Sequence, residues 1–103
     1  MNVGEYGVQF VLGTSFDMSA NTSLSLTFTK PDGTTLTVFN PDVTIDAAPI
    51  TTTAGTFDAN TYFLYTFESG DVDQSGDWSV RGTYNAAGPV HLISSIGYFT
   101  IEP

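Results

Sequence analysis

The sequence contains no cysteine, one histidine and only two cationic side chains, Lys30 and Arg81. The absence of cysteine excludes disulfides and thiolate metal sites. The two cations stand against eleven carboxylates, which gives a formal net charge of −9 at pH 7. Nucleic acids and anionic membrane surfaces are bound through clustered Lys or Arg. We therefore expect neither a nucleic acid nor a membrane among the partners of this chain.

Long apolar runs are also missing. No stretch approaches the roughly 18 apolar residues that a membrane span requires, and residues 1–5 lack the basic and apolar regions of a signal peptide. These absences predict a soluble protein that is made in a cytoplasm. The 41% of hydrophobic residues is ample for one core, and 103 residues is the length of one domain. We expect a single domain over residues 1–103.

Helical patterns are scarce as well. Thr, Ser, Gly, Asn and Asp dominate the spacers between apolar residues, the reverse of a helical composition, and no window carries apolar residues convincingly at helical spacing. Short β-rich runs recur between turn signals instead, which is typical of a sandwich or small barrel. The predicted strands cover residues 6–12, 23–30, 35–39, 44–46, 62–67, 77–84 and 90–101. Seven antiparallel strands fit an all-β, immunoglobulin-like sandwich.

The clearest local prediction is a hairpin. Leu24, Leu26 and Phe28 alternate with Ser and Thr, so one face of this strand is expected to meet the core. The turn at 30–33 has a physical basis, because a proline presets φ and Gly33 accepts a positive φ. Phe16 and Met18 are expected to turn inward from the polar connection at 13–21.

An acidic run between the strands at 62–67 and 77–84 suggests a metal site. Asp71, Asp73 and Ser75 stand at the oxygen-ligand positions 1, 3 and 5 of a calcium-type loop, with glycine at position 6, and Asp77 follows as a further candidate ligand. Position 12, where such a loop needs a bidentate glutamate, is Gly82. The incomplete motif favours a structural turn, in which Asp71 accepts backbone N–H groups and the glycine at 76 supplies a positive φ. No other cofactor is expected.

No constellation predicts catalysis. His91 is the only histidine and no cysteine accompanies it, so a zinc site would need several carboxylates. No glycine-flanked serine elbow is present for a nucleophilic triad, and no glycine-rich phosphate loop is present either. We therefore expect a protein that is not an enzyme, with His91 as a partly exposed strand residue.

The strand at 62–67 is apolar on both faces, so a second layer must cover its outer face. A neighbouring subunit is one source of that layer, since exposed aromatic patches mark interfaces. The aromatics around Trp78 are expected in the core, although a carbohydrate-binding face remains an alternative. The loops at 51–55 and 85–89 are further candidates for contact. The predicted interface residues are Tyr62, Leu64, Thr52, Asn85 and Pro89.

Several short motifs together resemble a known class of domain. They are residues 17–24 (DMSANTSL), the hairpin at 23–34 (SLSLTFTKPDGT), the strand end at 65–67 (YTF) and residues 70–78 (GDVDQSGDW). This set is similar to the small immunoglobulin-like domains of tailed-bacteriophage virion proteins, including the N-terminal domain of upper-baseplate adaptor proteins. Residues 42–57 are longer and richer in threonine than that pattern, and the long extension of the adaptors is missing. These departures favour a stand-alone accessory subunit.

The resemblance implies a non-enzymatic structural protein of the virion, made in the host cytoplasm. Its acidic, lysine-poor surface suits an outward-facing capsid decoration or cement subunit. The expected partners are other virion proteins, either the major capsid protein or tail proteins, with the chain present as a homo-oligomer or in many copies. The alternatives are a small tail, neck or baseplate component and a carbohydrate- or host-surface-binding module.

Overall fold

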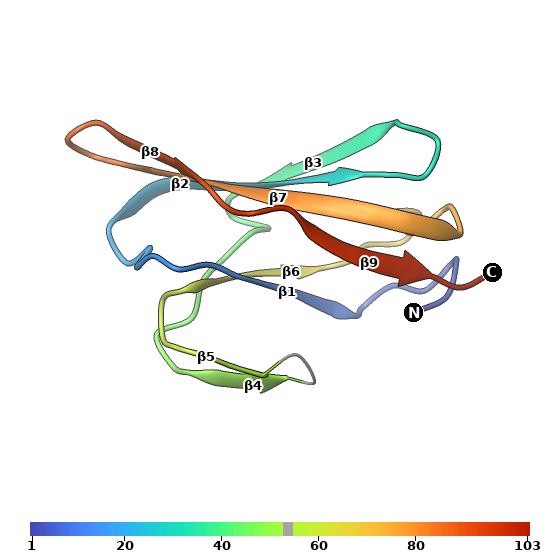
Figure 1. Ribbon diagram of the computed structural model, residues 1–103, viewed down its shortest axis with the longest axis horizontal. Helices are drawn as coiled ribbons and strands as arrows, with labels where there is room; N and C mark the ends of the chain where they lie inside the picture. Colours follow the sequence, from blue (N-terminus) through green and yellow to red (C-terminus); the bar gives the residue numbers. More distant parts are fainter. Residues whose placement is uncertain (53–54) are drawn as a thin grey trace.

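A computed structural model describes residues 1–52 and 55–103, and these residues form an antiparallel all-β fold without a helix. The strands lie in three layers, which Figure 1 shows one above the other. The upper layer holds β2, β3, β7, β8 and β9, the middle layer β1 and β6, and the lower layer β4 and β5. Their bounds are β1 Gln9–Gly13, β2 Asn21–Thr29, β3 Thr35–Phe39, β4 Ile50–Thr52, β5 Gly55–Phe57, β6 Tyr62–Thr66, β7 Gly76–Ala86, β8 Val90–Ile93 and β9 Gly97–Ile101.

The five-stranded upper sheet is built around β2 and β7. Its order is β3-β2-β7-β8, and β9 also pairs with β7. The predicted alternation in β2 is confirmed, because Leu24, Leu26 and Phe28 are buried while the Ser and Thr residues between them face outward. The predicted turn is confirmed too: the Gly33 N–H donates to the Lys30 carbonyl (2.9 Å), and Gly33 has a φ of 88°.

The last predicted strand, 90–101, is divided into β8 and β9. Both pair with the same edge of β7, β9 with its first half and β8 with its second. Between them the register shifts by one residue, which is the signature of a β-bulge. The bulge is held by Ser94, whose backbone N–H donates to the Gly82 carbonyl (2.9 Å) and whose hydroxyl accepts the Gly82 N–H (2.8 Å).

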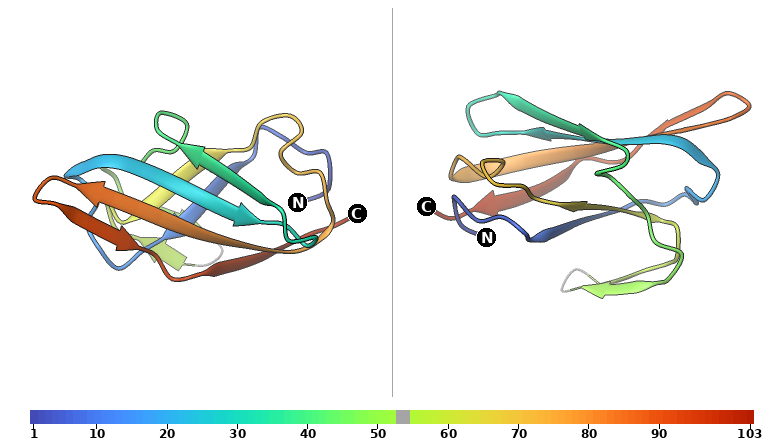
Figure 2. Two further views of the ribbon diagram at one scale, coloured as in Figure 1. Left: turned by 90° about the horizontal axis from the view of Figure 1, so that it is seen from above. Right: turned by 180° about the vertical axis from the view of Figure 1, so that it is seen from behind.

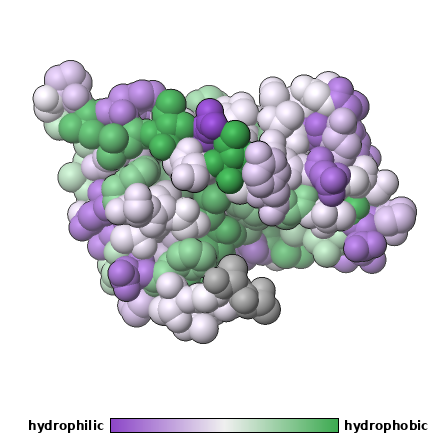
Figure 3. Space-filling model, in the orientation of Figure 1, coloured by the Kyte–Doolittle hydropathy of each residue, from purple (hydrophilic) through white to green (hydrophobic). Residues whose placement is uncertain are grey.

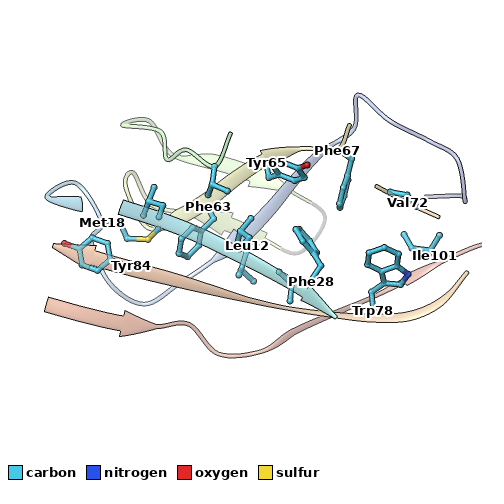
Figure 4. Close-up of a cluster of buried hydrophobic side chains, with 14 residues drawn as sticks. Leu12, Met18, Phe28, Phe63, Tyr65, Phe67, Val72, Trp78, Tyr84 and Ile101 are labelled. Atoms are coloured by element: carbon cyan, nitrogen blue, oxygen red, sulfur yellow. The ribbon is translucent and has the colours of Figure 1, made fainter. Parts of the chain in front are cut away.

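The core lies between the upper and middle layers (Figure 4). Phe63, Tyr65 and Phe67 point from the β6 side toward the upper sheet, and Trp78 occupies the end of the core near Ile101. Aromatic rings fill much of this space at edge-on or tilted angles, an arrangement that adds to the gain from burial. The methionine at 18 is fully buried, as predicted for the connection before β2.

The lower layer explains why β6 is apolar on both faces. Tyr62 and Leu64 point away from the main core, yet both are buried, and the Phe57 ring of β5 packs against Tyr62 at 6.4 Å. The Tyr62 hydroxyl donates to the Ala48 carbonyl (2.5 Å). The two views in Figure 2 show the β4–β5 hairpin beneath β1 and β6. The cover expected from a neighbouring subunit is thus supplied by the chain itself.

The predicted fold class is confirmed: the chain is an all-β, sandwich-like domain with antiparallel sheets. The described residues form nine strands rather than seven: the division of the last strand adds one, the predicted loop at 51–55 holds parts of two further strands, β4 and β5, and one predicted strand is lost. Residues 53 and 54 of that loop lie outside the described part of the chain. The predicted strand at 44–46 is reduced to one bridge between Thr44 and Leu64. Across residues 1–52 and 55–103, the structure has no helix long and apolar enough to cross a membrane.

Candidate functional site

The acidic turn after β6 is organised by Asp71. Its carboxylate accepts a hydrogen bond from the Glu68 backbone N–H (2.8 Å) and another from the Tyr65 hydroxyl (2.5 Å). Burial raises the pKa of the Tyr65 phenol, and the hydrogen bond to Asp71 acts in the same direction, so Tyr65 remains a neutral donor. Gly76 has a φ of 121° where the chain enters β7. These contacts match the predicted structural turn.

The other predicted calcium ligands have different partners. Asp73 pairs with Lys30 at 2.9 Å, and Asp77 accepts a hydrogen bond from the Thr100 hydroxyl at 3.0 Å. Ser75 is exposed. Within the described ranges, no three His, Cys, Asp or Glu side chains are grouped so that they could hold a metal ion. The calcium site remains a prediction, and the contacts favour the structural interpretation of this turn.

Replacing Asp71 by asparagine is expected to lower the free energy of unfolding by about 1–2 kcal/mol, because two hydrogen bonds lose their charged acceptor. Asp73→Asn is the matched control in the same turn. It removes an ion pair whose carboxylate is half exposed, and such pairs contribute at most about 1 kcal/mol. Urea unfolding of both variants measures the difference.

We also expect the addition of calcium to leave the melting temperature of the protein unchanged. A rise in the melting temperature that Asp71→Asn abolishes would instead support the calcium site.

The five predicted interface residues do not form one surface. Tyr62 and Leu64 are buried under the lower layer, and Thr52 lies half-buried in β4. The amide of Asn85, near the end of β7, bonds to Ser23 and His91 across the upper sheet. Pro89 is exposed beside it, at the tip of the β7–β8 hairpin, where exposed apolar side chains also lie. A role in contact stays a prediction for all five.

The aromatic residues considered for sugar binding lie inside the molecule. Trp78 is 1% exposed and its indole N–H donates to the Gln74 carbonyl at 3.1 Å. Tyr65, Phe67 and Tyr84 are buried in the same core. The prediction that these side chains form the core is therefore confirmed, and they do not make an aromatic binding face.

The outer face of the upper sheet is lined with small hydroxyl side chains. Register places Thr29 beside Thr35 and Ser79, and it places Thr27 beside Thr37 and Arg81. A shallow groove of about 330 Å³ runs across this face, and it is lined by Thr27, Thr29, Ser79, Val80, Arg81, Thr83, Ile93 and Ile96. The strands β2, β3, β8 and β9 contain no carboxylate, and β7 contains only Asp77. We call this surface the outer face.

The two cations of the chain differ in their surroundings. Lys30 has a 13% exposed side chain, pairs with Asp73 and lies 5.7 Å from the centre of the Trp78 ring. Arg81 is exposed in the groove and forms no ion pair with the described residues. Lys30 therefore has a structural role, whereas the Arg81 guanidinium is available to a group outside the chain.

Exposed apolar side chains also follow β8 and β9, where Ile93 and Ile96 line the groove and Leu92 lies on the opposite face of the sheet. We call them the apolar edge: Val90, Leu92, Ile93, Ile96 and Tyr98. Their exposed fractions range from 38% at Val90 and Leu92 to 77% at Tyr98. Figure 3 shows hydrophobic side chains gathered over β8, at its upper left. Large contiguous apolar surfaces on soluble proteins usually mark sites of interaction.

Sequence reasoning did not identify this surface, although a signal was present. No Asp or Glu occurs between Asp77 and Glu102, in a chain with eleven carboxylates. Residues 90–93 are also apolar at successive positions apart from His91, which an ordinary half-buried strand would not be. That signal becomes interpretable only once β8 is known to be an edge strand.

His91 lies exposed on β8, as expected. Its Nδ1 atom is 2.6 Å from the side-chain oxygen of Asn85, an amide that orients the ring but supplies no nucleophile.

Comparison of the chain with known protein families, curated proteins and solved structures finds no match.

Proposed function

We propose that this chain is a non-enzymatic structural subunit of a tailed-phage virion that decorates the capsid and docks through its outer face. The observation that carries the proposal is the composition of that face. It combines exposed isoleucines, an exposed tyrosine and an arginine that has no ion pair in the described part of the chain with almost no carboxylates. Arg, Tyr and large apolar residues are enriched at protein interfaces, whereas Lys, Glu and Asp are depleted.

The distribution of charge supports a subunit that covers a particle. Ten of the eleven carboxylates lie outside the strands, and only Asp77 lies in one. With the outer face docked, the acidic loops would remain in solvent, where negative charge favours solubility and discourages nonspecific association. The hairpin and the acidic turn resemble those of phage virion domains, and this resemblance is the reason for proposing a phage particle.

The direct test is to add the purified chain to heads assembled without it. We expect saturable binding and a higher temperature of head disruption, because a ligand that binds only the assembled state stabilises that state. Ile96→Lys, which places a charge beside the groove, is expected to weaken binding at least tenfold. Ala47→Lys adds the same charge at an exposed site outside the upper sheet and is expected to bind like the original chain.

The alternatives give different results in the same experiment. Binding to isolated tails, with none to heads, would place the subunit in the tail, neck or baseplate. Binding to a glycan array that Ile96→Lys abolishes, without binding to either particle, would favour the sugar-binding module. Equal head binding by both lysine variants would rule out docking through the outer face.

A further inference from the structure

The upper sheet ends in an edge strand that lacks the usual protection. Free edges expose unpaired N–H and C=O groups, and proteins commonly block them with charged side chains, proline or covering segments. The end of β9 is covered in this way, since Met1 and Val3 exchange backbone hydrogen bonds with Glu102 (2.9 Å each). In β8 all four residues are exposed and none is Lys, Asp, Glu or Pro. Beyond its pairing with β7, no strand of the described ranges lies along β8.

The same strand has uncovered apolar side chains on both faces. Figures 1 and 2 show the β7–β8 hairpin extending past the end of the middle layer. Leu92 lies opposite the buried Tyr84 and shares its inward direction, yet Leu92 is 38% exposed. On the outer face, Ile93 is 52% exposed. A strand of this kind is suited to continuing a sheet with another strand.

The distribution of carboxylates indicates which molecule supplies the added strand. A chain with a net charge of −9 repels its own copies wherever carboxylates face each other, over a range of about 8 Å at physiological salt. The hairpin tip and β8 carry no carboxylate, so two copies can approach there without opposing acidic groups. A basic partner would find no carboxylate at this site with which to form an ion pair. The chemistry therefore fits a second, equally acidic copy of this chain.

We propose that two copies pair through their β8 strands, antiparallel and about a twofold axis perpendicular to the sheet. Residues opposite each other in an antiparallel pair lie on the same face, so the axis lies midway between the same residue of the two strands. With the axis at Leu92, the two Leu92 side chains meet below the sheet, and each His91 faces the second copy's Ile93 above it. Pairing covers the β8 residues of the apolar edge, Val90, Leu92 and Ile93, in each copy, whereas Tyr98 lies on β9, outside the pairing.

The pairing has a consequence for docking. A twofold axis perpendicular to the sheet keeps both outer faces on the same side, so that the dimer presents two Arg81 grooves to one surface. Two linked sites raise avidity beyond that of either site. The pairing itself is independent of the proposed function and is measured without any particle.

Because the chain has no cysteine, a single introduced cysteine reports the pairing cleanly. Cβ atoms opposite each other in an antiparallel pair lie about 4.5–5.5 Å apart, close to disulfide range. We expect Leu92→Cys to form a covalent dimer quickly under mild oxidation. The control is Thr37→Cys, which places a cysteine on β3, the opposite edge of the same sheet, where the native side chain is exposed. It is expected to cross-link at least tenfold more slowly.

Sedimentation equilibrium provides the second readout. The original chain is expected to dimerise, Ile93→Lys to weaken the dimer at least tenfold, and Thr37→Lys to leave it unchanged, all with the same circular dichroism spectrum. A chain that is monomeric at every concentration would overturn the pairing, and so would cross-linking of Thr37→Cys as fast as that of Leu92→Cys. Protection of the β8 amides only on heads, with a monomer in solution, would assign β8 to a virion protein instead. A dimer that binds no particle would leave this inference intact and refute the proposed function.

Discussion

Trp78→Ala is expected to lower the free energy of unfolding by about 3–5 kcal/mol, a large part of the roughly 5–15 kcal/mol that stabilises a domain of this size. Trp78 is 1% exposed and packs against Phe99 at 5.9 Å and under the Lys30 ammonium. Its loss leaves a cavity and removes the donor to the Gln74 carbonyl. Urea unfolding monitored by circular dichroism measures the change.

Tyr98→Ala is the matched control for this variant. Tyr98 lies on β9, next to the partner of Trp78 in the ladder, but it is 77% exposed on the outer face. Surface substitutions of this kind change stability by no more than about 0.5 kcal/mol. Equal losses in the two variants would show that Trp78 does not lie in the core, and this part of the fold would then be wrong.

Gly82→Ala is expected to destabilise the fold by about 1–3 kcal/mol or more, because the core has no room for a methyl group there. A Cβ at Gly82 would lie 2.4 Å from Cε2 of the Phe63 ring, and the backbone of Gly82 also holds the bulge at Ser94. The ring belongs to the middle layer, so the substitution would push the two layers apart. Thermal unfolding of the variant tests this contact.

A double-mutant cycle separates the steric clash from other effects. Phe63→Leu shortens the side chain that faces Gly82 and costs stability by itself. If the clash is the cause, Gly82→Ala costs less in the Phe63→Leu background, with a coupling energy of about 0.5–3 kcal/mol. Additive effects of the two substitutions would contradict the close approach of the two layers at this point.

The parts of the fold that the sequence predicted are those with a local cause. In β2, strict alternation of apolar and polar residues defines the buried face, and the turn after it is determined by Pro31 and Gly33. Asp71 was also predictable, because a carboxylate in a short polar turn accepts nearby N–H groups. These features depend on residues that are close in the sequence.

The missed features depend on distant contacts. The lower layer is a short, threonine-rich hairpin whose role comes from Phe57 packing on Tyr62, and nothing local in residues 50–57 indicates that contact. The division of the last strand results from hydrogen bonds between Ser94 and Gly82, twelve positions apart. A strand that is apolar on both faces indicates a second cover, but not whether the chain or a partner supplies it.

The outer face could not be predicted from the sequence for a related reason. Thr27, Arg81 and Ile96 come from three separate segments, and only the register of the upper sheet brings them to one groove. In the sequence, the scarcity of cations argues only against nucleic acids and anionic membranes. The structure adds that one of the two cations is used internally, which leaves Arg81 as the single cation on a nearly carboxylate-free face.

Hydroxyl-radical footprinting of the chain bound to heads tests the docking face most directly. Two tyrosines serve as internal reporters: Tyr98 on the outer face is 77% exposed, and Tyr6 near the N-terminus is 65% exposed. Docking through the outer face predicts that binding reduces oxidation of Tyr98 severalfold and leaves Tyr6 as reactive as in the free chain. Protection of Tyr6 with Tyr98 still fully reactive would contradict the account.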